Sequence, residues 1–189
     1  MLVLIIIAAV FLYLFCGIKT DKTVKTLIKI VPTTACAVYA LTKGSSVQIC
    51  AGMWICVLAD AFLEHRFIPG AVLFAAAHVF FIAGFAVRHT PETLQYLLFA
   101  VLCAVFALVL LKGRKKRYRE VMLVYGAFLA AMTALASGCG AELACAGILF
   151  AFSDSLIAVR MLYGKRVRAG DWLCMGTYYS ALILMAAGA

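Results

Sequence analysis

The sequence predicts an all-α polytopic membrane protein, a bundle of eight transmembrane helices that forms a single domain over residues 1–189. Hydrophobic residues make up 67% of the chain and charged residues only 13%, whereas a soluble domain carries about 25% charged residues. Apolar stretches close to the ~20 residues that a membrane helix needs follow one another with short connections. The basic residues gather at alternate connections. These observations leave no room for a separate soluble domain.

Eight apolar stretches are expected to form the membrane helices, at residues 1–18, 25–42, 47–64, 69–88, 93–112, 119–137, 140–162 and 171–188. The first has no basic residue before it and no clear small-residue cleavage site, so it is interpreted as a membrane helix and not as a cleaved signal peptide. The second has a polar start, where Lys25 and Lys29 can extend to the membrane interface. Pro32 either kinks this helix or marks its true beginning.

The basic residues predict the orientation of the helices. Of the 17 Lys and Arg residues, all but Lys43 and Arg88 lie in or beside the odd-numbered connections. Because positive charge stays on the cytoplasmic side, both termini are expected outside the cell membrane and the basic loops inside. The basic run at 112–119 is therefore interpreted as a topology determinant, with anionic lipid or nucleic acid as the alternative partner. Spans one to four and five to eight are candidates for a parallel repeat, although the identity between them is thin.

Two aspartates lie within apolar stretches, where a carboxylate costs roughly 2.5–3.5 kcal/mol on insertion scales. Asp60 precedes Arg66 by six residues, and Asp154, between two serines, precedes Arg160 by six. Both spans run inward, so the two carboxylates are expected at nearly the same depth, about 9 Å from those arginines. Two neighbouring carboxylates cannot both ionise easily, and a protonated acid beside an anion suits general acid–base hydrolysis. The alternative is a structural polar pair that is hydrogen-bonded to nearby serines and tyrosines.

Other polar residues of the apolar stretches are candidates for supporting roles. His78 is expected near the membrane middle, where it would shuttle a proton, orient a water or be purely structural. Tyr125, Tyr178 and Tyr179 would either hydrogen-bond the carboxylates or a substrate headgroup, or pack with their hydroxyls satisfied.

The sequence gives little support for a metal or a cofactor. A catalytic zinc typically needs three protein ligands, usually rich in histidine, and only His78 is deep. Asp60, His78 and Asp154 remain an alternative ligand set, although nothing in their spacing demands it. The eight cysteines show no CxxC pattern and are interpreted as small hydrophobes. No GxSxG elbow, P-loop or dinucleotide fingerprint is present. We therefore expect no metal, no cofactor and no nucleic-acid partner.

Four segments together resemble the lysoplasmalogenase family of small multi-spanning membrane proteins: Ala59–Leu63, Gly70–His78, Gly147–Leu156 with its Phe-Ser-Asp-Ser-Leu core, and Tyr178-Tyr179. The resemblance covers the chain from about residue 25 to its end. It implies an eight-helix membrane hydrolase that takes a lysophospholipid from the bilayer. The reaction implied is cleavage of the vinyl ether bond of lysoplasmalogens to a fatty aldehyde and a glycerophospho-base, either choline or ethanolamine. The family's two intramembrane aspartates map onto Asp60 and Asp154, and its histidine onto His78.

The resemblance is not complete. This chain has Ala59 before the first aspartate, where the family often has Gly, and Phe81 three residues after the histidine, where the family often has Tyr. It has Lys29 and Pro32 apart, where the family tends to have Lys-Pro near the start of span two. After the tyrosine pair it has Ser180-Ala181-Leu182, where the family usually has Gln. These departures affect expected headgroup contacts more than the acid pair. Lys29 and Ser153 are counted, with the histidine and the tyrosines, among the supporting or substrate-binding residues. Two other functions stay open, a proton-coupled transporter that uses the same buried carboxylates and a different lipid hydrolase.

Overall fold

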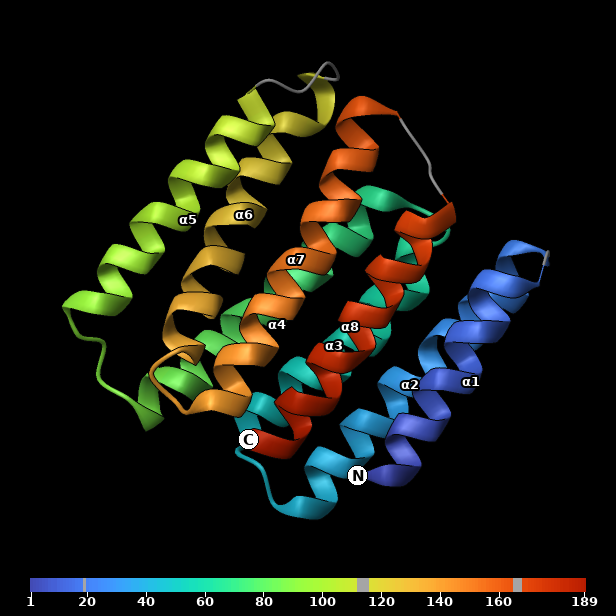
Figure 1. Cartoon of the computed structure of the whole chain (residues 1–189), viewed down its shortest axis with the longest axis horizontal. Helices are drawn as coiled ribbons and strands as arrows, with labels where there is room; N and C mark the ends of the chain where they lie inside the picture. The colour runs from blue at the N-terminus through green and yellow to red at the C-terminus, as the bar shows by residue number, and fades with distance from the viewer. Residues whose placement is uncertain (19, 112–115, 165–167) are drawn as a thin grey trace.

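The structure, a computed structural model, describes residues 1–18, 20–111, 116–164 and 168–189. In these ranges the chain is all-helical, as predicted, with eight helices (Figure 1). They are α1 (Leu2–Gly17), α2 (Lys22–Lys43), α3 (Val47–Leu63), α4 (Phe67–Arg88), α5 (Thr93–Leu111), α6 (Lys116–Ala136), α7 (Ala141–Tyr163) and α8 (Arg168–Gly188). Each of the eight apolar stretches thus corresponds to one helix, and α2, α4, α6 and α8 begin two or three residues before the predicted stretches.

Five of these helices are long and apolar enough to cross a membrane: α2, α4, α5, α7 and the part of α6 from Arg119 to Ala136. The outer surface of the bundle is apolar as well. On α5, Leu94, Val101 and Leu108 are each more than half exposed, and their seven-residue spacing places them on one face. A continuous exposed apolar surface of this kind is covered by lipid in a native protein. The protein is therefore a multi-pass integral membrane protein.

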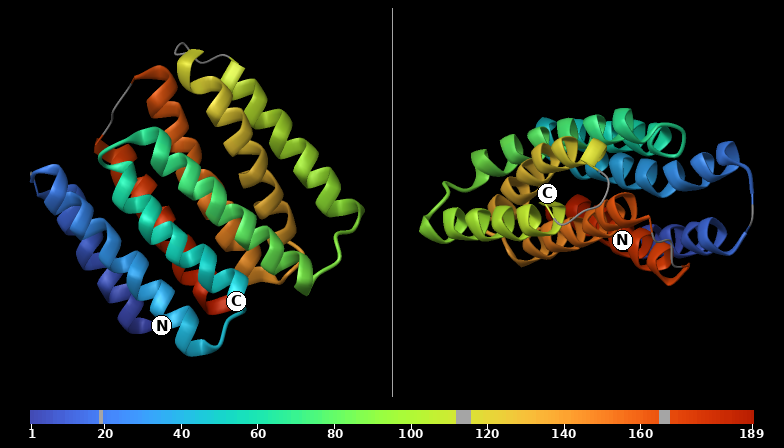
Figure 2. Two further views of the ribbon diagram at one scale, coloured as in Figure 1. Left: turned by 180° about the vertical axis from the view of Figure 1, so that it is seen from behind. Right: turned by 90° about the horizontal axis from the view of Figure 1, so that it is seen from above.

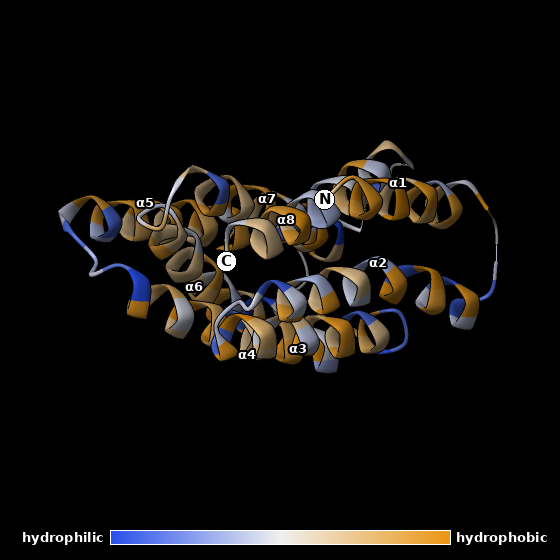
Figure 3. Cartoon of the chain, turned by 90° about the horizontal axis from the view of Figure 1, so that it is seen from below, coloured by the Kyte–Doolittle hydropathy of each residue, from blue (hydrophilic) through white to orange (hydrophobic). Residues whose placement is uncertain are grey.

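The helices form two layers joined at their edges (Figures 2 and 3). One layer holds α2, α3 and α4, and the other holds α1, α8 and α7. At one edge α6 packs against both α4 and α7, and α5 lies outside it. At the other edge α2 packs against α1 and α8. The middle of the bundle, between α3 and α4 on one side and α7 and α8 on the other, is filled by side chains.

Local capping explains where α2 begins and ends. The Asp21 carboxylate accepts a hydrogen bond from the Val24 backbone N–H at 3.0 Å, which satisfies one of the free N–H groups at the helix start. Gly44 ends the helix in the left-handed region at φ 79°, a conformation that glycine adopts without strain. Pro32 lies ten residues inside the helix. It therefore does not mark the beginning of the second span.

Aromatic rings connect the two layers at mid-bundle. Phe74 of α4 and Phe150 of α7 meet edge to face with ring centroids 6.2 Å apart, and Tyr178 of α8 contacts both at 5.9 and 5.5 Å. Such edge-to-face pairs add about 0.5–1.5 kcal/mol each beyond the area they bury. Phe74 and Tyr178 line the polar pocket described next, and Phe150 packs against both rings.

Candidate active site

Asp60 is fully buried on α3, and three groups surround its carboxylate. The Lys29 ammonium group lies 3.2 Å from Oδ1. The hydroxyls of Thr33 and Tyr178 each donate to Oδ2 at 2.7 Å. Lys29 and Thr33 come from the same face of α2, since residues four apart lie one above the other on a helix. The carboxylate therefore joins α2, α3 and α8.

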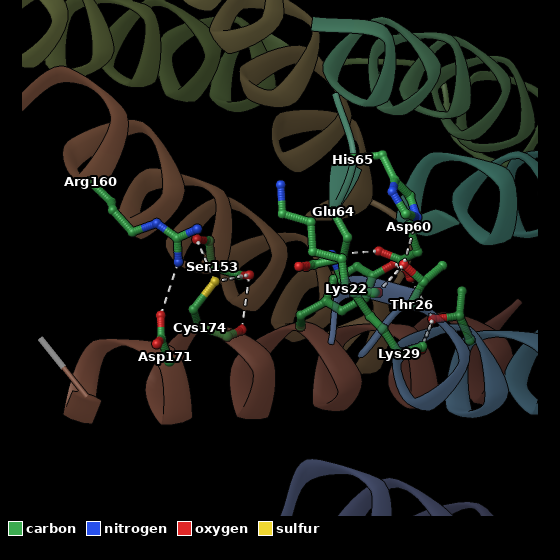
Figure 4. A network of polar contacts seen from close by, with 12 residues as sticks. Lys22, Thr26, Lys29, Asp60, Glu64, His65, Ser153, Arg160, Asp171 and Cys174 are labelled. Atoms are coloured by element: carbon green, nitrogen blue, oxygen red, sulfur yellow. Dashed lines mark hydrogen bonds and ion pairs between the residues drawn. The ribbon is translucent and has the colours of Figure 1, made fainter. Parts of the chain in front are cut away.

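The buried ammonium group of Lys29 also faces a second acid. Glu64 directly follows the last residue of α3, and its Oε1 lies 3.7 Å from Lys29 Nζ (Figure 4). Lys29 itself is only 3% exposed, so its side chain does not extend to the interface as its place near the start of the second span suggested. A buried cation needs such partners, because an unpaired charge in the interior is strongly unfavourable.

Asp154 on α7 is also buried but has fewer donors. The Tyr125 hydroxyl of α6 donates to its Oδ2. Among the described residues, no Lys or Arg forms an ion pair with this carboxyl group. The two aspartates therefore lie in different electrostatic surroundings, one beside a cation and the other beside a single hydroxyl.

Both aspartates line one small pocket, which we call the aspartate pocket. Its volume is about 10 Å³, and its lining residues are Lys29, Asp60, Leu63, Phe74, Ser153, Asp154, Ile157, Cys174, Met175 and Tyr178. A second pocket of about 20 Å³, the tyrosine pocket, lies on the other side of Asp154 and is lined by Leu63, Phe67, Ala71, Phe74, Met122, Tyr125, Asp154 and Ile157. Each has room for about one water molecule. The two pockets thus place space for a water molecule next to the Asp154 carboxyl group, as a hydrolytic reaction requires.

His78 lies behind Tyr125 and is not among the residues that line these two pockets. Its ring meets the rings of Tyr125 and Phe150 edge to face, at 5.4 and 5.1 Å between centroids. Nδ1 is 2.6 Å from the Phe74 carbonyl oxygen, which can only accept, so this nitrogen carries the proton. Nε2 is buried and has no hydrogen-bond partner in the part of the chain that the structure describes. His78 therefore supports the position of the tyrosine that contacts Asp154.

Ser153 and Tyr179 connect helices beside the pocket. The Ser153 hydroxyl donates to the Cys174 carbonyl oxygen at 3.0 Å and so joins α7 to α8 (Figure 4). The Tyr179 hydroxyl donates to the Lys29 carbonyl oxygen at 3.4 Å and joins α8 to α2. These two residues hold the helices that carry Asp154 and Lys29.

Compared with known protein families, the chain matches the YhhN family over residues 24–189. The chain belongs to the YhhN family. This family includes lysoplasmalogenases, which confirms the resemblance found in the sequence. The match contains every residue of the two pockets, whereas α1 lies before it. Neither the comparison with curated proteins nor that with solved structures found a match.

This YhhN protein gathers no metal-binding group among residues 1–18, 20–111, 116–164 and 168–189. Within those ranges no three His, Cys, Asp or Glu side chains lie close enough together to hold an ion. The alternative ligand set of Asp60, His78 and Asp154 is therefore not assembled, since the His78 ring is separated from the aspartate pocket by other side chains.

Sequence reasoning missed several residues around the acids of this YhhN protein. Thr33 and Glu64 contact Asp60 and Lys29, respectively, and each lies four residues from another member of the group. Given that Lys29 lies inside the bundle, the four-residue spacing predicts that Thr33 and Glu64 lie on the same helix faces as Lys29 and Asp60. Leu63, Phe74 and Ile157, which line both pockets, carry no such signal because apolar residues occur throughout the spans.

Proposed function

We propose that the protein is a membrane-embedded hydrolase that cleaves the vinyl ether bond of lysoplasmalogens to a fatty aldehyde and a glycerophospho-base. The observation that carries this proposal is one pocket lined by two buried aspartates with unequal partners, in a family that includes lysoplasmalogenases. A lipid substrate accounts for the burial of the acids, since the vinyl ether lies next to a chain that resides in the bilayer.

The unequal partners divide the roles of the two acids. An ammonium group and two hydroxyl donors stabilise Asp60 as an anion, because hydrogen bonds and opposite charges favour the ionised form. Among the residues that the structure describes, Asp154 has one hydroxyl donor and no paired cation, and an uncompensated charge in such surroundings is costly. Asp154 is therefore the protonated acid and Asp60 the carboxylate.

The first step is protonation of the substrate on carbon. Asp154 gives its proton to the alkenyl carbon farther from the ether oxygen, and the electron pair of the double bond forms the new C–H bond. The carbon next to oxygen becomes an oxocarbenium-like cation, which the Asp60 carboxylate stabilises. Glycosidases divide acid and anion between two carboxyl groups in the same way, and positioned acids of this kind typically contribute about 10²–10⁴-fold in rate.

Addition of water completes the reaction and restores both acids. A water molecule attacks the cation and gives up a proton to Asp60, and the product of this step is a hemiacetal. The Asp154 carboxylate then removes the hemiacetal hydroxyl proton, the bond to the glycerol oxygen breaks, and Asp60 returns its proton to that oxygen. One water is consumed, and no cofactor enters the balance.

A proton-coupled transporter would use the same buried carboxylates, but its sites typically lie at interrupted helices. Helices α3 and α7 run without a break through Asp60 and Asp154, which favours a fixed reaction site. A hydrolase acting on another lipid would share the whole arrangement, and only the substrate distinguishes it from the proposed activity.

The proposed setting is the cell membrane, with all eight helices crossing it, both termini outside, and lysophospholipid and membrane lipids as partners.

The contacts between helices support a parallel repeat of four helices plus four. Helix α2 packs on α3 and α3 on α4, as α6 packs on α7 and α7 on α8, and the contact of α4 with α6 has its counterpart in that of α8 with α2.

The test is an activity assay on purified protein and its Asp60→Asn and Asp154→Asn variants. We expect the wild type to release aldehyde from a lysoplasmalogen but to leave an ordinary acyl lysophospholipid intact. Each single variant should lose about 10²–10⁴-fold in rate, and the double variant should be little worse because the pair acts as a unit. Glu142→Gln, which removes an exposed carboxylate from the same helix as Asp154, is the control and should keep its activity.

Three results would redirect the proposal. Folded aspartate variants that work at near wild-type rates would show that the mechanism is wrong. Equal cleavage of the acyl lipid would indicate a different lipid hydrolase. Loss of turnover with a chelator, restored by zinc, would replace the metal-free mechanism.

A further inference from the structure

An apolar groove on the lipid-facing side of the bundle lies between α4 and α6, which pack against each other. This α4–α6 groove has a volume of about 410 Å³ and is lined by Ala71, Val72, Ala75, Glu120, Val121, Val124 and Tyr125. Val72 is 56% exposed and Val124 is 60% exposed, so the groove opens where lipid surrounds the protein. Its volume falls in the range of about 300–1,000 Å³ that is usual for ligand sites.

The α4–α6 groove adjoins the candidate active site. Ala71 and Tyr125 line both the groove and the tyrosine pocket. Asp154 then lines both the tyrosine pocket and the aspartate pocket. The three hollows therefore form a series that leads from the lipid-facing surface, past Asp154, to Asp60 and Lys29.

The polarity of the series changes along its length. The groove is lined by alanine and valine, apart from Glu120 and the tyrosine ring, whose hydroxyl is bound to Asp154. The aspartate pocket at the far end contains an ammonium group, two carboxyl groups and hydroxyls. An amphiphile with one long chain matches this order, with its chain in the groove and its polar end beside Lys29.

We infer that the alkenyl chain of the substrate enters between α4 and α6 and lies in the α4–α6 groove during the reaction, where the small side chain of Ala75 leaves it room. This inference rests on the proposed function. It also agrees with the roles of the acids, because Asp154, nearer the groove, faces the chain-side carbon that is protonated. Leu63, Phe74 and Ile157 narrow the passage to the acids and must shift when a chain enters.

A second groove makes the inference testable. It lies between α1 and α8, has a volume of about 510 Å³ and is lined by Ile5, Ala8, Ala9, Leu12, Gly176, Tyr179, Ser180, Ile183 and Leu184. It is larger than the α4–α6 groove, but it shares no lining residue with either pocket that contains an aspartate. Size alone would favour this second groove, and continuity with the acids favours the first.

The first experiment maps the chain without requiring catalysis. Purified protein is photo-crosslinked to a saturated 1-O-alkyl lysophospholipid that carries a diazirine near the end of its chain, and the labelled residues are located by peptide mass spectrometry. We expect labels at Val72, Ala75, Val121 or Val124 that an excess of the unmodified alkyl lipid removes. Labels in the α1–α8 groove, or labels spread over the lipid-facing helices and unaffected by the competitor, would overturn the inference.

The second experiment uses matched substitutions and two chain lengths. Ala75→Phe fills the α4–α6 groove, and Ala9→Phe adds the same side chain to the α1–α8 groove. We expect Ala75→Phe to lose at least about tenfold in kcat/KM for a long-chain lysoplasmalogen but to keep its rate on a short-chain vinyl ether, while Ala9→Phe changes neither. The reverse pattern would overturn the inference and leave the proposed hydrolase standing. A wild type that cleaves neither substrate would instead refute the proposed function, and the crosslinking result would still decide where a lipid chain binds.

Discussion

Lys29 contacts several parts of the candidate site. Its ammonium group lies 3.2 Å from Asp60 and 3.7 Å from Glu64, and its backbone carbonyl accepts from the Tyr179 hydroxyl. It thereby fixes the charge next to Asp60 and the positions of α2, α3 and α8 together. In the proposed mechanism Asp60 is the anion, and Lys29 is its charged partner, because the other two groups that contact it are neutral hydroxyls.

Removal of the Lys29 cation is expected to destabilise the fold, and the loss should depend on Asp60. Breaking a buried ion pair by removing one partner costs about 3–5 kcal/mol, since it leaves an uncompensated charge. Lys29→Met should therefore lower the free energy of unfolding by that amount, as measured by chemical denaturation of the purified protein in detergent. In the double variant Lys29→Met/Asp60→Asn, where no charge is left unpaired, most of the stability should return.

The double variant distinguishes the effect of the ion pair on stability from its effect on activity. It should remain inactive although its stability recovers, because the anion is missing. If Lys29→Met alone unfolds at the wild-type denaturant concentration, the ion pair contributes nothing and the assignment of Asp60 as the stabilised anion loses its basis.

The sequence predicted the pairing of the two aspartates but not the partners that make them different. Equal spacing from Asp60 and Asp154 to an arginine placed both carboxyl groups at one depth, and both line one pocket. Lys29 was expected at the interface, because a lysine near the start of a span usually extends there. Lys29 can be buried because Asp60, on another helix, pairs with it. The sequence pattern along α2 alone gives no information about that partner.

At the scale of helices, close approach of α3 and α4 positions Asp60 against the core. Gly52 of α3 faces the ring of Phe81 of α4, and a Cβ at Gly52 would lie 2.5 Å from Phe81 Cε1. Phe81 is fully buried, so it has little space to move. Small residues at such a contact allow two membrane helices to pack closely.

Gly52→Ala is therefore expected to destabilise the bundle by about 1–3 kcal/mol, the usual cost of overpacking a filled core. Gly126→Ala on α6 is the matched control, because its Cβ would meet Phe106 at an ordinary 3.5 Å and alanine is the better helix former. Comparison of the two unfolding midpoints checks the prediction. Equal midpoints would mean that Phe81 yields without cost and that α3 does not depend on this contact.

Helix positions were easier to predict than helix pairing. Apolar length located every helix, although α2 begins at Lys22 and α4 at Phe67, a few residues before the expected starts. The polar residues at 22–25 hid the first turn of α2, which Asp21 caps. The contact of α4 with α6, on which the proposed chain path depends, follows from side-chain fit between helices and has no signature along the chain.

At the scale of the whole molecule, the two ends of the bundle differ in charge. At the end formed by the C-termini of α2, α4 and α8, Lys43 donates to the Ala187 carbonyl oxygen and Arg88 to that of Gly188 at 2.9 Å. Both cations thus bind carbonyls at the C-terminal end of α8, where a helix favours positive charge. Of the other basic residues, those that the structure describes lie at or near the opposite end of the bundle, except Lys29, which is buried beside Asp60. The remaining ones fall on residues 19, 112–115 and 165–167, outside those that the structure describes.

This distribution predicts the orientation of the molecule, with the Lys43 and Arg88 end outside and the strongly basic end in the cytoplasm. The test places single cysteines at Thr90→Cys, in the exposed loop after α4, and at Lys115→Cys, in a variant whose eight native cysteines are replaced by serine or alanine. A membrane-impermeant maleimide should label position 90 in intact cells, and position 115 only after the membrane is permeabilised. Labelling of position 115 in intact cells would show that the orientation is the reverse of the predicted one. The substrate would then reach Asp60 and Asp154 from the outer leaflet, since both acids precede the arginines of the basic end by six residues.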